Sequence, residues 1–194
     1  MFCPIHNRRM QKWFEEVMGE QCNHRVSLPD GYGEIHVPQV SFNVIYILSH
    51  LYRHIFTEGI GLRQLLDYYY VLISDDLLLI RDRVQKELKH LGLWKFAQAV
   101  MFVMKEVFGL LEDRMVAPMD EKEGSFLLDE IMRGGNFGQY DDRMGSKVDE
   151  SKIHRYFRMN LRNLRFVKHY PAEALSEPLF RTWFAVWKKI HAIE

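Results

Sequence analysis

Residues 42–73 read FNVIYILSHLYRHIFTEGIGLRQLLDYYYVLI, and their pattern is the clearest sign of architecture in the chain. The first half repeats apolar residues every three or four positions, as an amphipathic helix does. This apolar stripe consists of Val44, Ile47, Leu48, Leu51 and Ile55. Gly59-Ile60-Gly61 then predicts a turn, and a second helix is expected over 62–73. Since so short a connection turns the chain back on itself, the stretch predicts two antiparallel neighbouring helices.

The residues before this pair predict one more helix and a turn-rich connection. Residues 5–18 carry apolar side chains on approximately one helical face. Residues 20–39 contain two prolines and two glycines, which indicates a loop. Polar and apolar residues alternate near 34–37, so a short strand is expected there. Ser41 is expected to cap the start of the following helix.

Five further helices are predicted downstream. A helix capped by Ser74 should end at Gly92, and the next, over 93–109, is apolar around much of its circumference and should be central in the core. The remaining three are expected from Asp120 to Gly134-Gly135, from Asp149 or Ser151 to before Pro171, and over about 177–193.

These expectations together predict an all-α fold, an irregular multi-helix bundle with at most a short strand or hairpin near residues 34–37. We expect residues 1–194 to form a single helical domain, since no repeat or low-complexity tract divides them. The glycine-rich and polar segment 134–147 is expected to form a long loop.

Composition excludes several functional classes. Of the 194 residues, 26 are basic and 26 acidic, so no overall field favours nucleic acid or an anionic membrane. No apolar run reaches the roughly 18 residues that cross a bilayer. Cys3 and Cys22 are too few for a disulfide framework, and no signal peptide is readable before them. These features predict a cytoplasmic protein that binds neither membrane nor nucleic acid.

One group of polar residues within 50–67 has the spacing of a site. His50 and His54 stand four residues apart, so their side chains point the same way and could bind a metal if a third ligand arrived. Glu58 continues that face, and Arg63 and Asp67 share a face of the next helix. A structural network of these side chains, with a simple Arg63–Asp67 ion pair, is the alternative that the sequence favours.

Two weaker features lie further along the chain. Gly135, Asn136 and Gly138 belong to a glycine loop whose backbone could approach a phosphate, although no strand and no GxxxxGK[ST] pattern accompany it. The basic helix that ends before Pro171 could meet phosphates, but a solvated amphipathic face is the favoured interpretation. Protease and hydrolase signatures such as HExxH and GxSxG are absent from the sequence.

The stretch HLYRHIFTEGIGLRQLLDYYYVL, from His50 to Leu72, resembles the C-terminal part of an uncharacterised nucleotidyltransferase family common in gut Bacteroidetes. The residues that match are His50, His54, Gly61, Leu62, Arg63, Gln64 and Asp67. The later GGNFG is also similar to a glycine-bearing stretch of that family. Members resemble polymerase-beta-like nucleotidyltransferases, which hold catalytic Mg²⁺ with an Asp-x-Asp motif on a strand.

This chain has no Asp-x-Asp motif. The resemblance therefore implies that the catalytic carboxylates belong to another part of a longer protein. The chain is expected to be the C-terminal helical half of a longer protein, inactive alone, with Mg²⁺ and a nucleoside triphosphate (NTP) bound only by the missing catalytic portion. Arg63 would contact a triphosphate or an acceptor, His50, His54 and Asp67 would shape the cleft, and Glu58 and Gln64 are weaker candidates. The expected partner is that catalytic portion or a second copy. A stand-alone interaction module and a small histidine-based metal protein remain alternatives.

Overall fold

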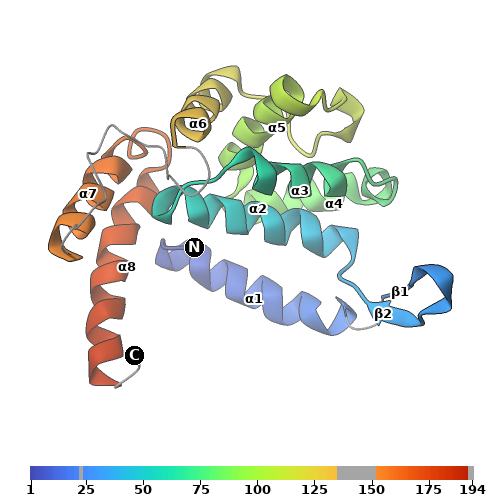
Figure 1. The fold of residues 1–194 in the computed structure, drawn as a ribbon, viewed down its shortest axis with the longest axis horizontal. Coiled ribbons are helices and arrows are strands. Elements are labelled where there is room, and N and C mark those ends of the chain that lie inside the picture. The colour runs from blue at the N-terminus through green and yellow to red at the C-terminus, as the bar shows by residue number, and fades with distance from the viewer. Residues whose placement is uncertain (22–23, 135–151, 192–194) are drawn as a thin grey trace.

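The computed structural model describes residues 1–21, 24–134 and 152–191. Within these ranges the chain forms eight α-helices, one two-stranded hairpin and two short 3-10 turns (Figure 1). In chain order the elements are α1 (Pro4–Gln21), β1 (Arg25–Ser27), η1 (Pro29–Gly31), β2 (Glu34–His36), α2 (Val40–Thr57), α3 (Leu62–Leu72), α4 (Asp76–His90), α5 (Trp94–Phe108), η2 (Glu112–Arg114), α6 (Glu121–Gly134), α7 (Lys152–Leu164) and α8 (Pro171–Ile190). The predicted all-α fold class is confirmed.

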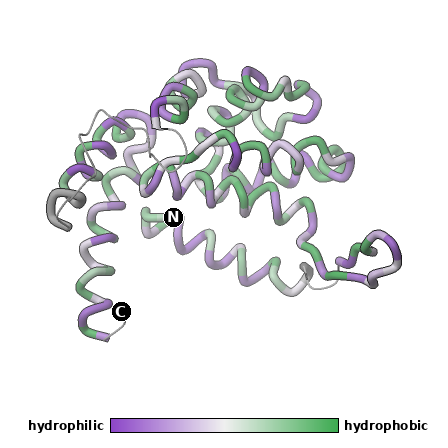
Figure 2. Tube along the Cα trace, in the orientation of Figure 1, coloured by the Kyte–Doolittle hydropathy of each residue, from purple (hydrophilic) through white to green (hydrophobic). Residues whose placement is uncertain are grey.

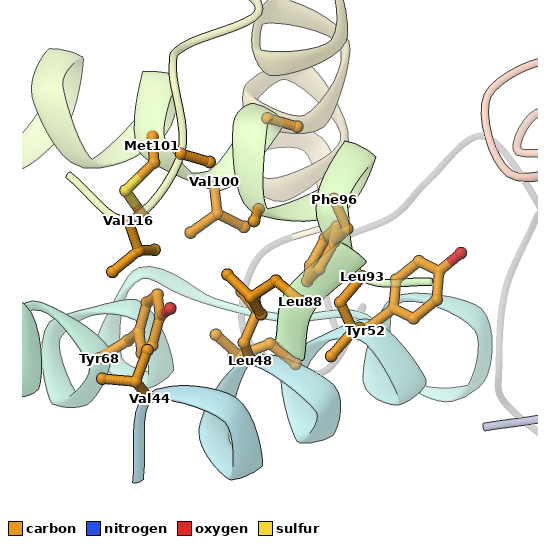
Figure 3. Packing of buried hydrophobic residues seen from close by; sticks show 14 of the residues in the cluster. Val44, Leu48, Tyr52, Tyr68, Leu88, Leu93, Phe96, Val100, Met101 and Val116 are labelled. Carbon is orange, nitrogen blue, oxygen red and sulfur yellow. The ribbon is translucent and has the colours of Figure 1, made fainter. Parts of the chain in front are cut away.

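The core lies where α2, α3, α4 and α5 meet (Figure 3). Val44 and Leu48 of the predicted α2 stripe are completely buried, and Tyr68 of α3 and Leu88 of α4 join them. The helix α5 buries side chains around most of its circumference, which confirms its predicted central position. Each fully buried aliphatic side chain of this kind stabilises the fold by about 1.5–3 kcal/mol relative to exposure.

The helix α6 packs closely along α5, and a glycine permits this approach. A Cβ atom placed on Gly124 would lie only 2.3 Å from Cβ of Phe102. The start of α6 is held by Asp120, whose Oδ1 accepts a hydrogen bond of 3.0 Å from the Glu123 amide. The predicted capping role of Asp120 is therefore confirmed.

The expected short strand near 34–37 exists as β2 and pairs with β1. The register is antiparallel, with Val26 opposite Ile35, and every residue of both strands is exposed. Asp30 and Gly31 turn the chain with positive φ angles of 57° and 75°. This hairpin extends from the end of α1, away from the core (Figure 1), so it contributes little burial.

The helices α1 and α8 are joined by a buried carboxylate. Glu173, in the first turn of α8, accepts hydrogen bonds at Oε2 from the amides of Phe2 and Cys3, at 2.5 and 2.9 Å. Its Oε1 lies 2.7 Å from Nδ1 of His6. Glu173 is only 1% exposed, so its carboxylate has lost its hydrogen bonds to water. These contacts within the protein replace them.

The helix α8 begins six residues earlier than the sequence indicated. The prediction placed its start near Glu177, whereas the helix begins at Pro171, which occupies its first turn. Pro178 then lies inside the helix. A proline has no N–H and normally disrupts a helix interior. Pro171 at the first helical position and the contacts of Glu173 both favour the earlier start.

The helix α7 attaches to the end of α2 through its own polar side chains. Arg162 donates hydrogen bonds to the carbonyl oxygens of Ile55 and Thr57, at 2.7 and 3.3 Å. A cation is favourable there because helix C-termini carry unpaired carbonyls and partial negative charge. Asn163 is buried beside it and donates to Phe56 O at 3.0 Å. Arg162, which belongs to the predicted basic face of this helix, thus binds backbone carbonyls of α2.

Two predicted caps differ from the structure. Ser41 lies inside α2, whose N-cap is the extended residue Gln39, and no side chain caps that end. Ser74 precedes α4, but Asp75 is its N-cap and again no side-chain cap forms. In both places backbone carbonyls receive the first amides of the helix, Gln39 O from Asn43 N and Ser74 O from Leu77 N. Backbone bonding can start a helix without the expected hydroxyl.

No described helix combines the length and the apolar character needed to cross a lipid bilayer. Figure 2 shows hydrophobic and hydrophilic residues mixed along the helices, including the projecting end of α8. The predicted loop 134–147, apart from Gly134 at the end of α6, lies outside the described residues, as do the candidates Gly135, Asn136 and Gly138.

Candidate functional site

The α2–α3 pair that the sequence predicted is formed, and the turn between its helices has a definite backbone. The amides of Glu58 and Gly59 both donate to His54 O, at 3.0 and 2.8 Å, which closes the last turn of α2. Gly59 has φ +87°, a left-handed conformation that glycine adopts without steric cost. Gly61 is the N-cap of α3, and its amide donates to Oε1 of Gln64 at 2.6 Å. Gln64 therefore has a structural role in capping α3.

His50 and His54 are in direct contact, as their spacing predicted. Their Nε2 atoms lie 3.0 Å apart and their rings meet edge to face, with centroids 4.3 Å apart. A hydrogen bond between two ring nitrogens requires one donor and one acceptor. The pair therefore shares one proton in this contact, and full protonation of both rings would break it.

Glu58 extends the histidine pair toward the end of α2. Its Oε2 lies 3.4 Å from Nδ1 of His54, and that nitrogen is enclosed without a well-oriented hydrogen bond. A proton on Nδ1 of His54 would face the carboxylate and leave its Nε2 free to accept from His50. Burial and the charge of His54 lower the pKa of His50 below its ordinary value of 6.5. The folded protein therefore favours the neutral form of His50, which can accept a hydrogen bond at the ring nitrogen that carries no proton.

A row of aromatic rings orients His50 from the other side. Tyr46 stacks on His50, with centroids 6.3 Å apart, and Phe42 stacks on Tyr46 at 5.2 Å. Trp13 of α1 completes the row by stacking on Phe42 at 5.5 Å. Stacked rings restrict one another's rotation, so the imidazole of His50 is held by packing as well as by its hydrogen bond.

Arg63 and Asp67 lie on the outer face of α3, away from its buried residues. Both side chains are exposed, and in the described part of the chain they form no ion pair with each other and no hydrogen bond with the histidines. Leu66 and Tyr70 share this face and are 37% and 63% exposed. The five residues 50, 54, 58, 63 and 67 thus divide into a contacting group on α2 and a separate exposed surface on α3.

The histidine pair does not gather a third metal ligand among the described residues. There, the group of three ligand side chains whose donor atoms lie within 4.8 Å of one another is Cys3, His6 and Glu173. Sequence reasoning did not select these residues. The spacing Cys3-x-x-His6 at a helix start was the available signal, but Glu173 is far away in the sequence.

The Mg²⁺ that the family resemblance implies can be tested against these donors. Mg²⁺ prefers near-octahedral oxygen ligands, whereas a thiolate and an imidazole suit softer ions. The cluster of Cys3, His6 and Glu173 therefore does not fit a catalytic Mg²⁺ pair, and we assign no nucleotidyl-transfer step to it.

A separate apolar hollow lies between the start of α1 and the middle of α8. It encloses about 330 Å³ and is lined mainly by Phe2, Leu179, Phe180 and Trp183. Trp183 and Leu179 are 57% and 73% exposed, which is unusual for large apolar side chains on a helix that has one buried end. Figure 1 shows the C-terminal end of α8, beyond this hollow, extending away from the other helices.

A family model described as uncharacterised nucleotidyltransferase matches residues 2–109. The matched region runs from α1 to α5 and contains the whole α2–α3 pair. Neither the curated proteins nor the solved structures gave a match. Because the matched residues make up more than half of its 194 residues, the chain belongs to the family of uncharacterised nucleotidyltransferases.

Proposed function

We propose that this chain is the helical, substrate-contacting part of a nucleotidyltransferase and that the transfer chemistry belongs to a separate catalytic part. Family membership supports the reaction class. Nucleotidyl transfer requires carboxylates fixed around Mg²⁺, and the sequence contains no Asp-x-Asp motif that would supply them. The role that suits these residues is binding and positioning.

The outer face of α3 is the observation that carries this proposal. Arg63 and Asp67 are exposed there without an internal ion pair, beside the exposed Leu66 and Tyr70. A charged pair that does not stabilise its own helix is available for a ligand, and Tyr70 offers a ring on which a base can stack. Arg63 would bind phosphate oxygens through its planar guanidinium.

The histidine pair would form the neighbouring wall of the cleft. His50 is neutral at pH 7 because burial lowers its pKa, so it can accept a hydrogen bond from a hydroxyl of the acceptor. Glu58, through His54, would orient the proton that the two rings share. In this scheme the α2 residues bind and orient, and the bond-making step takes place elsewhere.

The test combines a transfer assay with a binding assay on the purified chain. Incubation with labelled NTPs and Mg²⁺ or Mn²⁺ should give no transfer. Calorimetry should detect NTP binding that Arg63→Ala weakens by about tenfold or more, as expected for loss of a hydrogen-bonded charge. The matched control is Arg133→Ala, an exposed arginine on α6 that pairs with Asp129.

Two results would contradict the proposal. Robust transfer by this chain, abolished by a substitution within it, would show that it carries its own catalytic centre. Equal NTP affinity of the wild type and Arg63→Ala would remove the α3 face from the binding surface.

The exposed apolar end of α8 favours a second candidate, an interaction module. We propose that its occupant is the catalytic part of the same protein, since α8 lies outside the matched residues 2–109 and next to the α1 start. Trp183→Ser should then weaken association with that part and leave NTP binding unchanged. Concentration-dependent self-association in sedimentation experiments, lost in Trp183→Ser, would instead identify a second copy as the occupant.

A further inference from the structure

Cys3, His6 and Glu173 form a compact cluster that neither the family nor the proposed function uses. One donor atom from each side chain lies within 4.8 Å of the other two. Cys3 and His6 come from the first residues of the chain, and Glu173 comes from α8. The cluster is therefore assembled only when α1 and α8 pack together.

The two oxygens of the Glu173 carboxylate have different partners. Oε2 accepts from the amides of Phe2 and Cys3, which fixes the plane of the carboxylate. Oε1 faces Nδ1 of His6 at 2.7 Å. Backbone donors that hold one oxygen while the other points at a neighbouring ligand are a common arrangement around protein-bound metals, because they orient the ligating atom.

His6 and Cys3 are also held in place. The ring of His6 lies against Gly92, where an added Cβ would come within 2.6 Å of Nε2. Gly92 has φ +76°, so glycine is favoured there for its conformation too. Cys3 is a free thiol and 9% exposed. Among the described residues, Sγ of Cys3 forms no hydrogen bond, although it lies beside a carboxylate and an imidazole.

We propose that Cys3, His6 and Glu173 bind one Zn²⁺-class ion that ties α1 to α8. Sulfur, imidazole nitrogen and carboxylate oxygen are the donors that Zn²⁺ takes in proteins, at about 2.0–2.3 Å. Mg²⁺ and Ca²⁺ would be excluded, because they avoid thiolates. This inference does not rest on the proposed function.

The contact between His6 and Glu173 needs only a small adjustment to accept the ion. Two tetrahedral ligands at such distances are about 3.3 Å apart, so His6 and Glu173 would separate by roughly half an ångström from their 2.7 Å contact. The ion would replace the proton that now joins them, and the Cys3 thiol would lose its proton on binding. Three protein ligands leave a fourth position for water.

Cobalt substitution tests the proposal directly, since Co²⁺ adopts zinc-like sites and reports its ligands optically. The purified full chain, stripped with chelator and titrated with Co²⁺, should show a thiolate-to-cobalt charge-transfer band and visible tetrahedral d–d bands at one ion per chain. Cys3→Ser should abolish the charge-transfer band, while the matched variant Cys22→Ser should retain it. Zn²⁺ should displace Co²⁺ and raise the melting temperature of the wild type.

Histidine variants locate the site independently. His6→Gln should weaken Co²⁺ binding at least tenfold, whereas His50→Gln should leave it unchanged. Circular dichroism of the chelator-treated Cys3→Ser chain checks that the helices remain, because the hydrogen bond from Cys3 to Glu173 comes from the backbone amide, which the substitution keeps. Absence of stoichiometric metal binding, or a band that survives Cys3→Ser, or binding that depends on His50, would overturn the proposal.

Discussion

The side-chain amide of Asn163 lies 3.0 Å from Oε2 of Glu177, in a joint where each residue is only 1% exposed. The same amide nitrogen donates to Phe56 O, so Asn163 connects α7 with both α8 and α2. Burial raises the pKa of the Glu177 carboxyl, and Arg181 and the amide of Asn163 oppose that shift. The joint therefore depends on the donors that Asn163 and Arg181 supply, whereas Oδ1 of Asn163 is buried without a hydrogen-bond partner among the described residues.

Asn163→Ala is expected to lower the free energy of unfolding by about 1–3 kcal/mol, because it leaves the Phe56 carbonyl and the Glu177 carboxylate with fewer donors in a buried place. Urea denaturation monitored by circular dichroism measures the change. The control is Asn43→Ala, an exposed amide at 3.4 Å from Pro38 O, whose effect should stay within about 0.5 kcal/mol. Equal effects of the two variants would contradict the assigned role.

The stability of the protein should decrease as the pH falls below about 6.5, in part because of His50. Its pKa is lowered in the folded state, so below 6.5 the unfolded chain binds more protons and protonation favours unfolding. His50→Gln should flatten this dependence between 6.5 and the folded-state pKa. Urea denaturation at a series of pH values measures it, with Ser49→Ala, a neighbouring position on α2 that does not titrate, as the control. An unchanged slope in His50→Gln would count against the shift.

Gly124→Ala should destabilise the protein by about 1–3 kcal/mol, although alanine favours helices over glycine by about 1 kcal/mol. The reason is the 2.3 Å approach that the new Cβ would make to Cβ of Phe102. Gly19→Ala is the matched control, since nothing lies within 4 Å of a Cβ at that helical position. Thermal melts should shift in opposite directions for the two variants, and a stabilised Gly124→Ala would show that α5 and α6 are less close.

Gln64→Ala should cost about 0.5–2 kcal/mol through loss of the hydrogen bond that its Oε1 accepts from the Gly61 amide. Gln64→Glu keeps an acceptor oxygen and should remain near wild-type stability. If both variants are as stable as the wild type while NTP binding falls, Gln64 is a ligand residue and the capping role is minor.

Local patterns were sufficient for much of the helical framework. The α2 stripe, the Gly59–Gly61 turn and the Asp120 cap depend on residues within a few positions of one another, and all three formed as predicted. The contact of His50 with His54 belongs to this class too, because one helical turn brings the rings together. The start of α8, which lies earlier than predicted, is also where Glu173 contacts residues far away in the sequence.

Periodicity along the chain specified which residues form helices, and which of their faces are apolar, because backbone geometry repeats every 3.6 residues. It could not specify which helices meet. The approach of Glu173 to Cys3 and His6 across about 170 positions, and the separation of the α3 surface from the histidine pair, follow from how whole helices pack around one core. The spacing and the resemblance both indicated His50 and His54, whereas the tertiary structure brings together Cys3, His6 and Glu173 where α8 packs against the start of the chain.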